Sequence, residues 1–199
     1  MKNIKKTTLA VLLIIFVFPA ISEGETSALE INANSTDMEL KFDTQLELYE
    51  TPVGLGVGAI NSDNDYFIFN VNVMIKDAVF MPALMLGLGF KGLLGQTKID
   101  SKEFDIGALN FLITGEYDFR VDSSNLPVSA SASLCWAPES LGFADTERYV
   151  EFTFSVYAYV VSNAAIVAGY REIEARFSDD PDNKTKSDSA LFVGCKLVF

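Results

Sequence analysis

The stretch MELKFDTQLELY, residues Met38–Tyr49, alternates between two kinds of side chain. One set is apolar apart from a threonine and consists of Met38, Leu40, Phe42, Thr44, Leu46 and Leu48. The other set is polar and mostly charged, and consists of Glu39, Lys41, Asp43, Gln45, Glu47 and Tyr49. A period of two indicates a β-strand with one apolar and one polar face. In a soluble sheet the apolar face would pack on a core, whereas in a membrane barrel it would face lipid and the polar face would line the lumen.

The same alternation recurs along the rest of the chain. It is present in residues 53–60, 66–75, 83–91, 128–136, 149–160, 164–177 and 190–199. A further segment, 103–117, shifts phase near Leu109-Asn110, which predicts a β-bulge. Segments of about ten residues have the length of tilted strands that cross a bilayer. Tight turns at one end, with polar or longer loops at the other, are typical of outer-membrane barrels; the longer loops are expected at 61–65, 93–102, 138–148 and 178–189.

A soluble β-sandwich or a lipocalin-like cup would also give many alternating strands. The polar phase argues against both, because it is often small and neutral where a solvated face would carry charges, as at Asn70, Asn72, Ser129, Ser131 and Ser133. Glycines such as Gly54, Gly56 and Gly58 would leave holes in a sandwich core, whereas in a lumen they leave room for large side chains such as Tyr157 or Arg171. The sequence therefore predicts an all-β protein, a transmembrane antiparallel up-and-down β-barrel.

The number of strands follows from parity. A barrel with both termini on the periplasmic side has an even number of strands. Nine strands are counted from Met38 onward, and the short run Ala28–Ala33 supplies a tenth. We therefore expect ten strands, with eight as the alternative if Met38–Tyr49 does not span.

The first residues have the three parts of a secretory signal peptide. These are a basic region with Lys2, Lys5 and Lys6, an apolar run from Leu9 to Phe18, and the small-residue cleavage site Ala20-Ile21-Ser22. We expect a cleaved signal peptide over residues 1–22 and an outer-membrane barrel domain over residues 23–199. The alternative, a retained membrane anchor, is disfavoured because the apolar run is short for a spanning helix.

Composition limits the chemistry that is available to the chain. Nucleic-acid binding is not expected, because the net charge of −12 offers no basic surface. The chain has no histidine, which removes Ser-His and Asp-His catalysts and most catalytic zinc sites. Cys135 lies on the polar phase of its strand and Cys195 on the apolar phase of another, so we expect two free thiols. The sequence predicts no enzyme activity, no cofactor and no metal site.

Charged residues on the polar phases nearly balance one another. They are the acids Glu39, Asp43, Glu47, Glu116 and Glu151 and the bases Lys41, Lys91, Arg171 and Lys196. Because buried charges must be paired, this near-balance predicts a network of ion pairs that fills the lumen.

The second half of the chain resembles the YfaZ family of outer-membrane proteins. The resemblance is carried by Trp136-Ala137-Pro138-Glu139-Ser140-Leu141, by Tyr149 and Glu151, by Gly169-Tyr170-Arg171, by the acidic loop Asp179–Asn183 and by the final strand that ends at Phe199. It implies an outer-membrane barrel and supplies no activity. The terminal aromatic residue resembles the signal that delivers such barrels to the barrel-assembly machinery.

These observations predict a small outer-membrane barrel with a side-chain-filled lumen and a structural or surface-interaction role. The alternatives are a narrow channel for small solutes and a soluble periplasmic ligand-binding barrel. The expected partners are outer-membrane lipid, lipopolysaccharide and the barrel-assembly machinery, which would recognise the strand ending in Phe199; the barrel itself is expected to be a monomer. The acidic loops at 61–65 and 178–183 are interpreted as solvated tips rather than calcium sites.

Overall fold

The computed structural model describes residues 26–49, 51–63, 66–99, 102–122, 126–178 and 185–199. The predicted leader and the acidic loop Asp179–Asn183 therefore lie outside the described residues. The strands are β1 (Thr26–Ala33), β2 (Asp37–Leu48), β3 (Thr51–Ser62), β4 (Tyr66–Ala78), β5 (Leu84–Ile99), β6 (Lys102–Asp118), β7 (Val128–Ala137), β8 (Gly142–Ala144), β9 (Thr146–Val161), β10 (Ala164–Phe177) and β11 (Thr185–Val198). A short 3-10 helix, η2 (Glu139–Leu141), precedes β8. In this described part of the chain, no helix is long and apolar enough to cross a membrane.

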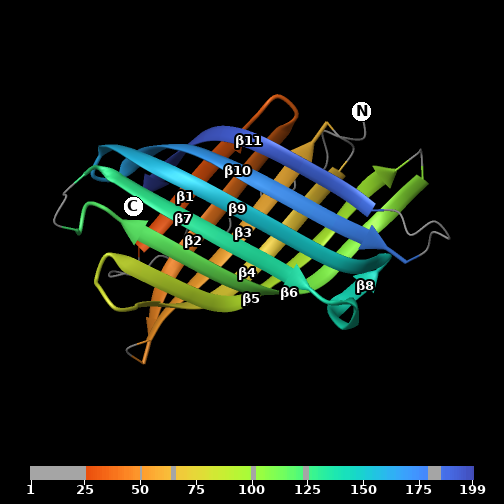
Figure 1. The fold of residues 1–199 in the computed structure, drawn as a ribbon, viewed down its shortest axis with the longest axis horizontal. Helices are drawn as coiled ribbons and strands as arrows, with labels where there is room; N and C mark the ends of the chain where they lie inside the picture. The colour runs from red at the N-terminus through yellow and green to blue at the C-terminus, as the bar shows by residue number, and fades with distance from the viewer. Residues whose placement is uncertain (1–25, 50, 64–65, 100–101, 123–125, 179–184) are drawn as a thin grey trace.

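The strands form one closed antiparallel barrel. Neighbouring strands pair in the order β5-β4-β3-β2-β1-β11-β10-β9-β7-β6, and β5 pairs with β6 to close the ring. Figure 1 shows the near and far walls inclined in opposite directions, as expected for tilted strands. β8 is an additional short strand that pairs with β6. The barrel therefore has ten strands, which confirms the predicted fold class and the predicted strand over Ala28–Ala33.

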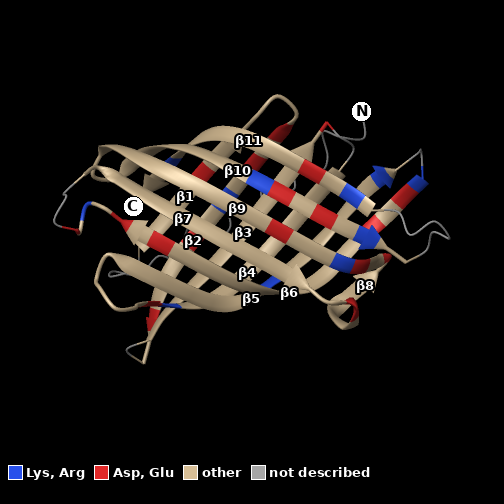
Figure 2. Cartoon of the chain, viewed as in Figure 1, with Lys and Arg blue, Asp and Glu red and all other residues tan. Residues whose placement is uncertain are grey.

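The two ends of the barrel differ. At one end, here called the terminal end, the backbones of Ser27 and Phe199 exchange two hydrogen bonds, each with an N–O distance of 2.9 Å. The opposite end, here called the loop end, carries the β1–β2 turn and the segment with η2 and β8. In Figure 2 the charged residues of β9 and β10 lie in the halves of these strands nearer the loop end.

The outer surface carries a belt of exposed apolar side chains. On β9 and β10, the side chains of one phase are largely buried inside the barrel and many of the other phase are exposed on its surface. Exposed members of the belt are Leu55, Val71, Val73, Ile75, Leu86, Leu88, Phe90, Phe111, Ile113, Leu134, Trp136, Phe152, Phe154, Ile166, Leu191, Val193 and Leu197. On β2, Met38 and Leu48 are exposed and Glu39 is buried, as predicted. Phe42 of the same apolar phase is 4% exposed, because it packs against Phe199.

The predicted bulge near Leu109-Asn110 is wrong. β5 and β6 pair without a register shift through Gly92–Leu109 and Lys91–Asn110. What changes at this point is the face on which the apolar residues lie. Phe104 and Ile106 are buried inside the barrel, whereas Phe111 is 42% exposed on its surface. A change of environment along one regular strand thus gives the same sequence signature as an inserted residue.

The predicted loop 93–102 is also wrong, because β5 continues to Ile99 and β6 begins at Lys102. These strands extend toward the loop end, where an apolar cluster lies inside the barrel. This loop-end core contains Ile60, Tyr66, Ile68, Leu93, Phe104, Ile106, Ala108, Ala137, Tyr149, Ile173, Ala175 and Phe177. Outward residues near this core include the polar and exposed Gln96 and Lys98. The predicted loops 138–148 and 178–189 begin where expected but end earlier, because β9 starts at Thr146 and β11 at Thr185.

The glycines of β3 allow close approach between neighbouring strands. A Cβ atom on Gly56 would overlap the side chains of Asp43 and Asn72, and one on Gly58 would lie 2.8 Å from Nδ2 of Asn70. The nearest side chains are therefore those of adjacent strands and not Tyr157 or Arg171, which the sequence suggested. These glycines make room for polar side chains of the adjacent strands β2 and β4.

Candidate functional site in the barrel lumen

Arg171 on β10 forms the centre of a polar network inside the barrel. Its Nη2 donates to Oδ2 of Asp37 at 2.8 Å, and its Nη1 lies 3.3 Å from Oε2 of Glu39. The three side chains are at most 5% exposed. The cation joins β10 to β2, which are three positions apart around the barrel, so the contact crosses the lumen.

Lys91 and Glu151 form a second buried ion pair. Nζ of Lys91 lies 2.7 and 2.8 Å from the two carboxylate oxygens of Glu151. The Tyr149 hydroxyl donates to Oε2 of Glu151 at 2.8 Å. Asn110 donates from Nδ2 to the backbone oxygen of Lys91 at 3.0 Å and orders the strand that carries the lysine. This pair connects β5 to β9, which are also three positions apart.

Lys41 pairs with two carboxylates at the β1 wall. Its Nζ lies 3.3 Å from Oε1 of Glu30 and 3.2 Å from Oε2 of Glu39. Asn32 donates from Nδ2 to the same two carboxylates, at 2.7 and 3.1 Å. The Tyr157 hydroxyl on β9 donates to Glu30 at 3.2 Å, so this cluster also reaches across the lumen.

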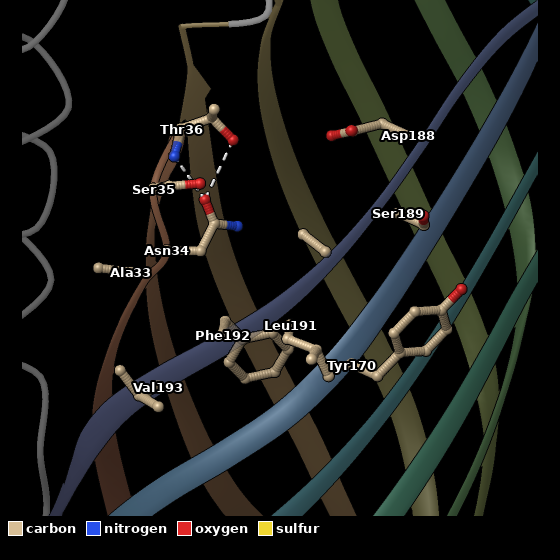
Figure 3. Close-up of a pocket in the computed structure, with 11 residues that line it drawn as sticks. Ala33, Asn34, Ser35, Thr36, Tyr170, Asp188, Ser189, Leu191, Phe192 and Val193 are labelled. Carbon is tan, nitrogen blue, oxygen red and sulfur yellow. Dashed lines mark hydrogen bonds between the residues drawn. The ribbon is translucent and has the colours of Figure 1, made fainter.

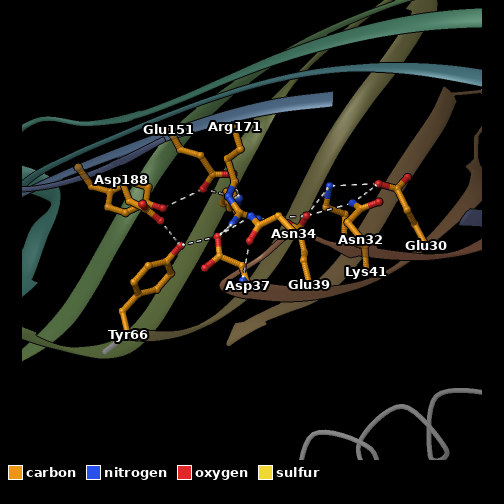
Figure 4. A network of polar contacts seen from close by, with 12 residues as sticks. Glu30, Asn32, Asn34, Asp37, Glu39, Lys41, Tyr66, Glu151, Arg171 and Asp188 are labelled. Atoms are coloured by element: carbon orange, nitrogen blue, oxygen red, sulfur yellow. Dashed lines mark hydrogen bonds and ion pairs between the residues drawn. The ribbon is translucent and has the colours of Figure 1, made fainter. Parts of the chain in front are cut away.

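A tyrosine links two more strands near the loop end. The Tyr66 hydroxyl donates to Oδ2 of Asp188 at 2.7 Å and lies 3.4 Å from Oδ2 of Asp37. Figure 4 shows Tyr66, Asp37 and Arg171 meeting in one chain of contacts, with Glu39, Lys41 and Glu30 continuing it. A buried charge needs a partner, and Arg171 and Lys41 supply one to the carboxylates of Asp37, Glu39 and Glu30.

Apolar side chains lie along the lumen on either side of the polar network. The loop-end core occupies one side. Nearer the terminal end, Tyr157, Ala165, Val167 and Phe192 form a second buried cluster, and Met74, Leu112 and Cys135 form a third. The lumen is therefore occupied by side chains over much of its length.

The structure brings together most, but not all, of the nine residues predicted from the polar phases. Glu39, Lys41 and Arg171 belong to one cluster, and Lys91 pairs with Glu151. Nζ of Lys196 lies 4.7 Å from the centre of the Tyr157 ring. Among the described residues, no ion pair within 4.0 Å is formed by the other three, which are Asp43, Glu47 and Glu116.

Sequence reasoning missed several residues of the network, which are Glu30, Asn32, Asp37, Tyr66, Tyr149 and Asp188. Tyr157, which was expected in the lumen, does contact Glu30 there. Asp37 lies one residue before the opening stretch and continues the phase of Glu39 and Lys41. Glu30 and Asn32 alternate in the same way on β1. The phase alone was enough to find these three. The tyrosine hydroxyls carry no such signal, because a tyrosine is compatible with either face.

Both cysteines are free thiols, as predicted, with Cys135 buried and Cys195 exposed. Within the described residues, no group of three His, Cys, Asp or Glu side chains is arranged to hold a metal ion.

Comparisons with known proteins give limited structural matches. No family model and no curated protein sequence matches the chain. Among solved structures, a major outer-membrane protein from Thermus thermophilus is 10% identical, with a TM-score of 0.44 and coverage of 89% of this chain and 100% of that one. The KdgM porin is also 10% identical, with a TM-score of 0.41 and coverage of 87% and 99%. The NanC porin is 7% identical, with a TM-score of 0.38 and coverage of 87% and 99%.

The chain's own surface defines its class. In lipid every backbone polar group must be satisfied within the protein, and a closed barrel achieves this. An apolar belt outside and charged residues inside are the reverse of a soluble barrel and the arrangement of an outer-membrane barrel. The protein is a transmembrane β-barrel of the outer membrane.

Proposed function

We propose that this protein is a closed outer-membrane barrel with a structural or surface-interaction role, without a conducting pore and without enzyme activity. The observation that supports the proposal is the set of buried contacts that cross the lumen. Arg171 with Asp37, and Lys91 with Glu151, join strands three positions apart. A solute that passed through would have to separate these buried charges, which is energetically costly.

We also propose that the chain is related to the YfaZ family. The support is the resemblance in residues 136–141, at Gly169-Tyr170-Arg171 and at the terminal Phe199. Arg171, one of the residues of this resemblance, is also the centre of the lumen network. The proposed partners are membrane lipid, lipopolysaccharide and the assembly machinery that would recognise β11, and the proposed state is a monomer.

Single-channel conductance in planar bilayers tests the closed lumen. The wild-type barrel is expected to give no steady unitary current. The double variant Lys91→Ala/Glu151→Ala removes a whole ion pair without leaving either charge alone, and we expect it to admit intermittent currents. The matched control is Lys98→Ala/Glu103→Ala, which removes an exposed pair and leaves the lumen unchanged. Steady unitary currents from the wild type would replace the proposal with a narrow channel for small solutes.

A further inference from the structure

A cleft interrupts the barrel wall beside β1. Pairing between β1 and β11 ends at Ala33 and Val193, whereas β11 continues toward the loop end as far as Thr185. Over that extension, β10 is the strand that pairs with β11 in the described part of the chain. A cleft of about 620 Å³ lies between the β1–β2 turn and this extension of β11. Figure 3 shows the turn residues Asn34–Thr36 facing β11 and the neighbouring Tyr170 of β10.

Side chains from both faces of the wall line this wall cleft. Phe192 belongs to the inward phase of β11 and is 4% exposed. Leu191 and Val193 belong to the outward phase and are 76% and 65% exposed. An intact barrel wall separates these two phases, so the cleft is a lateral gap that opens on the apolar belt.

The gap has a backbone edge as one border. Because Ser27 and Phe199 exchange both backbone hydrogen bonds, every second residue of β11 counted from Phe199 directs its N–H and C=O toward β1. By the same alternation, the backbone N–H and C=O groups of Leu191 and Ser189 point into the cleft. Among the described residues, no strand supplies hydrogen-bond partners to these groups. Such groups need hydrogen-bond partners at the edge of a membrane.

The lining is graded from apolar to polar. Ala33, Leu191 and Val193 form its side nearer the belt, and Ser35, Thr36 and Ser189 form its side nearer the loop end. Asp188 is the charged residue among the described residues of the lining, which include no lysine or arginine. A phosphate or carboxylate head group would therefore be repelled, whereas hydroxyl groups would be accepted.

We propose that the wall cleft binds a membrane amphiphile with an alkyl chain and a neutral, hydroxyl-rich head group, which is the chemistry of a glycolipid in the adjoining leaflet. The chain lies along Leu191 and Val193. The head-group hydroxyls bond to the backbone edge at Ser189 and Leu191 and to the serine hydroxyls beside it. This inference rests on the membrane location and is independent of whether the lumen conducts.

Photolabelling of the full mature barrel tests the site. The barrel is reconstituted in vesicles of phosphatidylethanolamine and phosphatidylglycerol that contain a small fraction of monoglucosyl diacylglycerol with a diazirine in one acyl chain. The matched probe is phosphatidic acid with the same diazirine chain. We expect mass spectrometry to find the glucosyl probe on peptides containing Ala33 and residues 189–193 several-fold more often than on the outward face of β9. We expect the phosphate probe to show no such preference.

Filling the cleft should abolish the preference. Ala33→Trp places a large ring on the apolar side of the cleft and is expected to lower labelling there several-fold. Ala158→Trp is the matched control, because Ala158 is an exposed outward alanine of β9 that does not line the cleft. Heat-modifiable gel mobility checks that each variant folds. If Ala33→Trp does not fold, Leu191→Asn removes the apolar surface at an exposed position and is expected to lower labelling in the same way.

Three results would overturn the proposal. The first is labelling spread evenly around the belt, and the second is equal capture of the phosphate probe at the cleft. The third is cross-linking of β11 to β11 of a second copy, which would show that a protein strand occupies the edge. None of these results bears on the conductance test of the closed lumen.

Discussion

At the scale of the residue, Arg171 is the side chain on which the lumen network depends most. It is 3% exposed and contacts Asp37 and Glu39, two carboxylates that are themselves buried. Removing one partner of a buried ion pair leaves the other charge without compensation, and this costs more than the pair itself contributes. The side chain therefore contributes to stability chiefly through the carboxylates that it neutralises.

Arg171→Ala is expected to lower the free energy of unfolding by about 3–5 kcal/mol, the range for breaking a buried ion pair. Urea unfolding of the barrel in detergent micelles measures this change. Lys98→Ala is the control, because the Lys98–Glu103 pair is exposed and such pairs contribute about 0–1 kcal/mol. Equal unfolding midpoints for Arg171→Ala and the wild type would mean that the network does not hold the walls together.

Two glycines of β5 differ in how much space surrounds them. A Cβ atom on Gly89 would overlap the backbone oxygen of Val73 and lie 2.6 Å from Cα of Met74, whereas one on Gly92 would have Val71 O as its nearest neighbour at 3.9 Å. We expect Gly89→Ala to lower the free energy of unfolding by about 1–3 kcal/mol, as overpacking does. Gly92→Ala should be tolerated. The same unfolding experiment compares the two variants, and an equal loss for both would contradict the close approach of β4 and β5.

At the scale of the element, the sequence predicted the strands well and their ends poorly. The alternation of Met38–Tyr49 and its repeats identified the barrel strands, because one period of two is enough to define two faces. It could not show where the apolar face moves from outside to inside. Phe104 and Ile106 are inside and Phe111 is outside on one regular strand, so the pattern was mistaken for a bulge.

The alternation predicted which residues of the candidate site lie in the lumen, but not which of them contact one another. Phase placed Glu39, Lys41, Lys91, Glu151 and Arg171 in the lumen, where the structure pairs them. Which charges meet depends on the register and tilt of strands far apart in the sequence. Asp188 and Tyr66 are separated by 122 residues, and no local pattern joins them.

Proline substitution distinguishes a paired strand from an edge. The N–H of Ile31 on β1 faces β11 opposite Cys195, whereas the same alternation directs the N–H of Ser187 toward the edge of β11 that β1 does not reach. Proline removes this donor and is tolerated at sheet edges but not within a ladder. We expect Ile31→Pro to lose the folded form on an unboiled gel and Ser187→Pro to keep it. Loss of the folded form in both variants would mean that the outer part of β11 is paired.

At the scale of the whole molecule, the barrel has two environments along its axis. Within the belt, apolar side chains face outward and the charged network lies inside. Toward the loop end, apolar side chains form the loop-end core and the outward residues are polar, as at Gln96 and Lys98. The second arrangement is that of a soluble barrel. The loop end is therefore suited to contact with water, and the belt to contact with lipid.

This division explains why the strands differ in length. β1 has 8 residues and β6 has 17, although about ten are enough to cross a bilayer. The additional residues of the long strands form the wall around the loop-end core. The short β1 leaves the wall cleft at the junction of the two environments.

Heat-modifiable gel mobility of the mature chain refolded in detergent tests whether the chain is a membrane barrel with its apolar face outward. We expect the unboiled and boiled samples to migrate differently, because the closed hydrogen-bonded barrel resists the detergent until it is heated. A chain that is folded and soluble without detergent, and that shows no shift on boiling, would instead have its apolar face in a protein core.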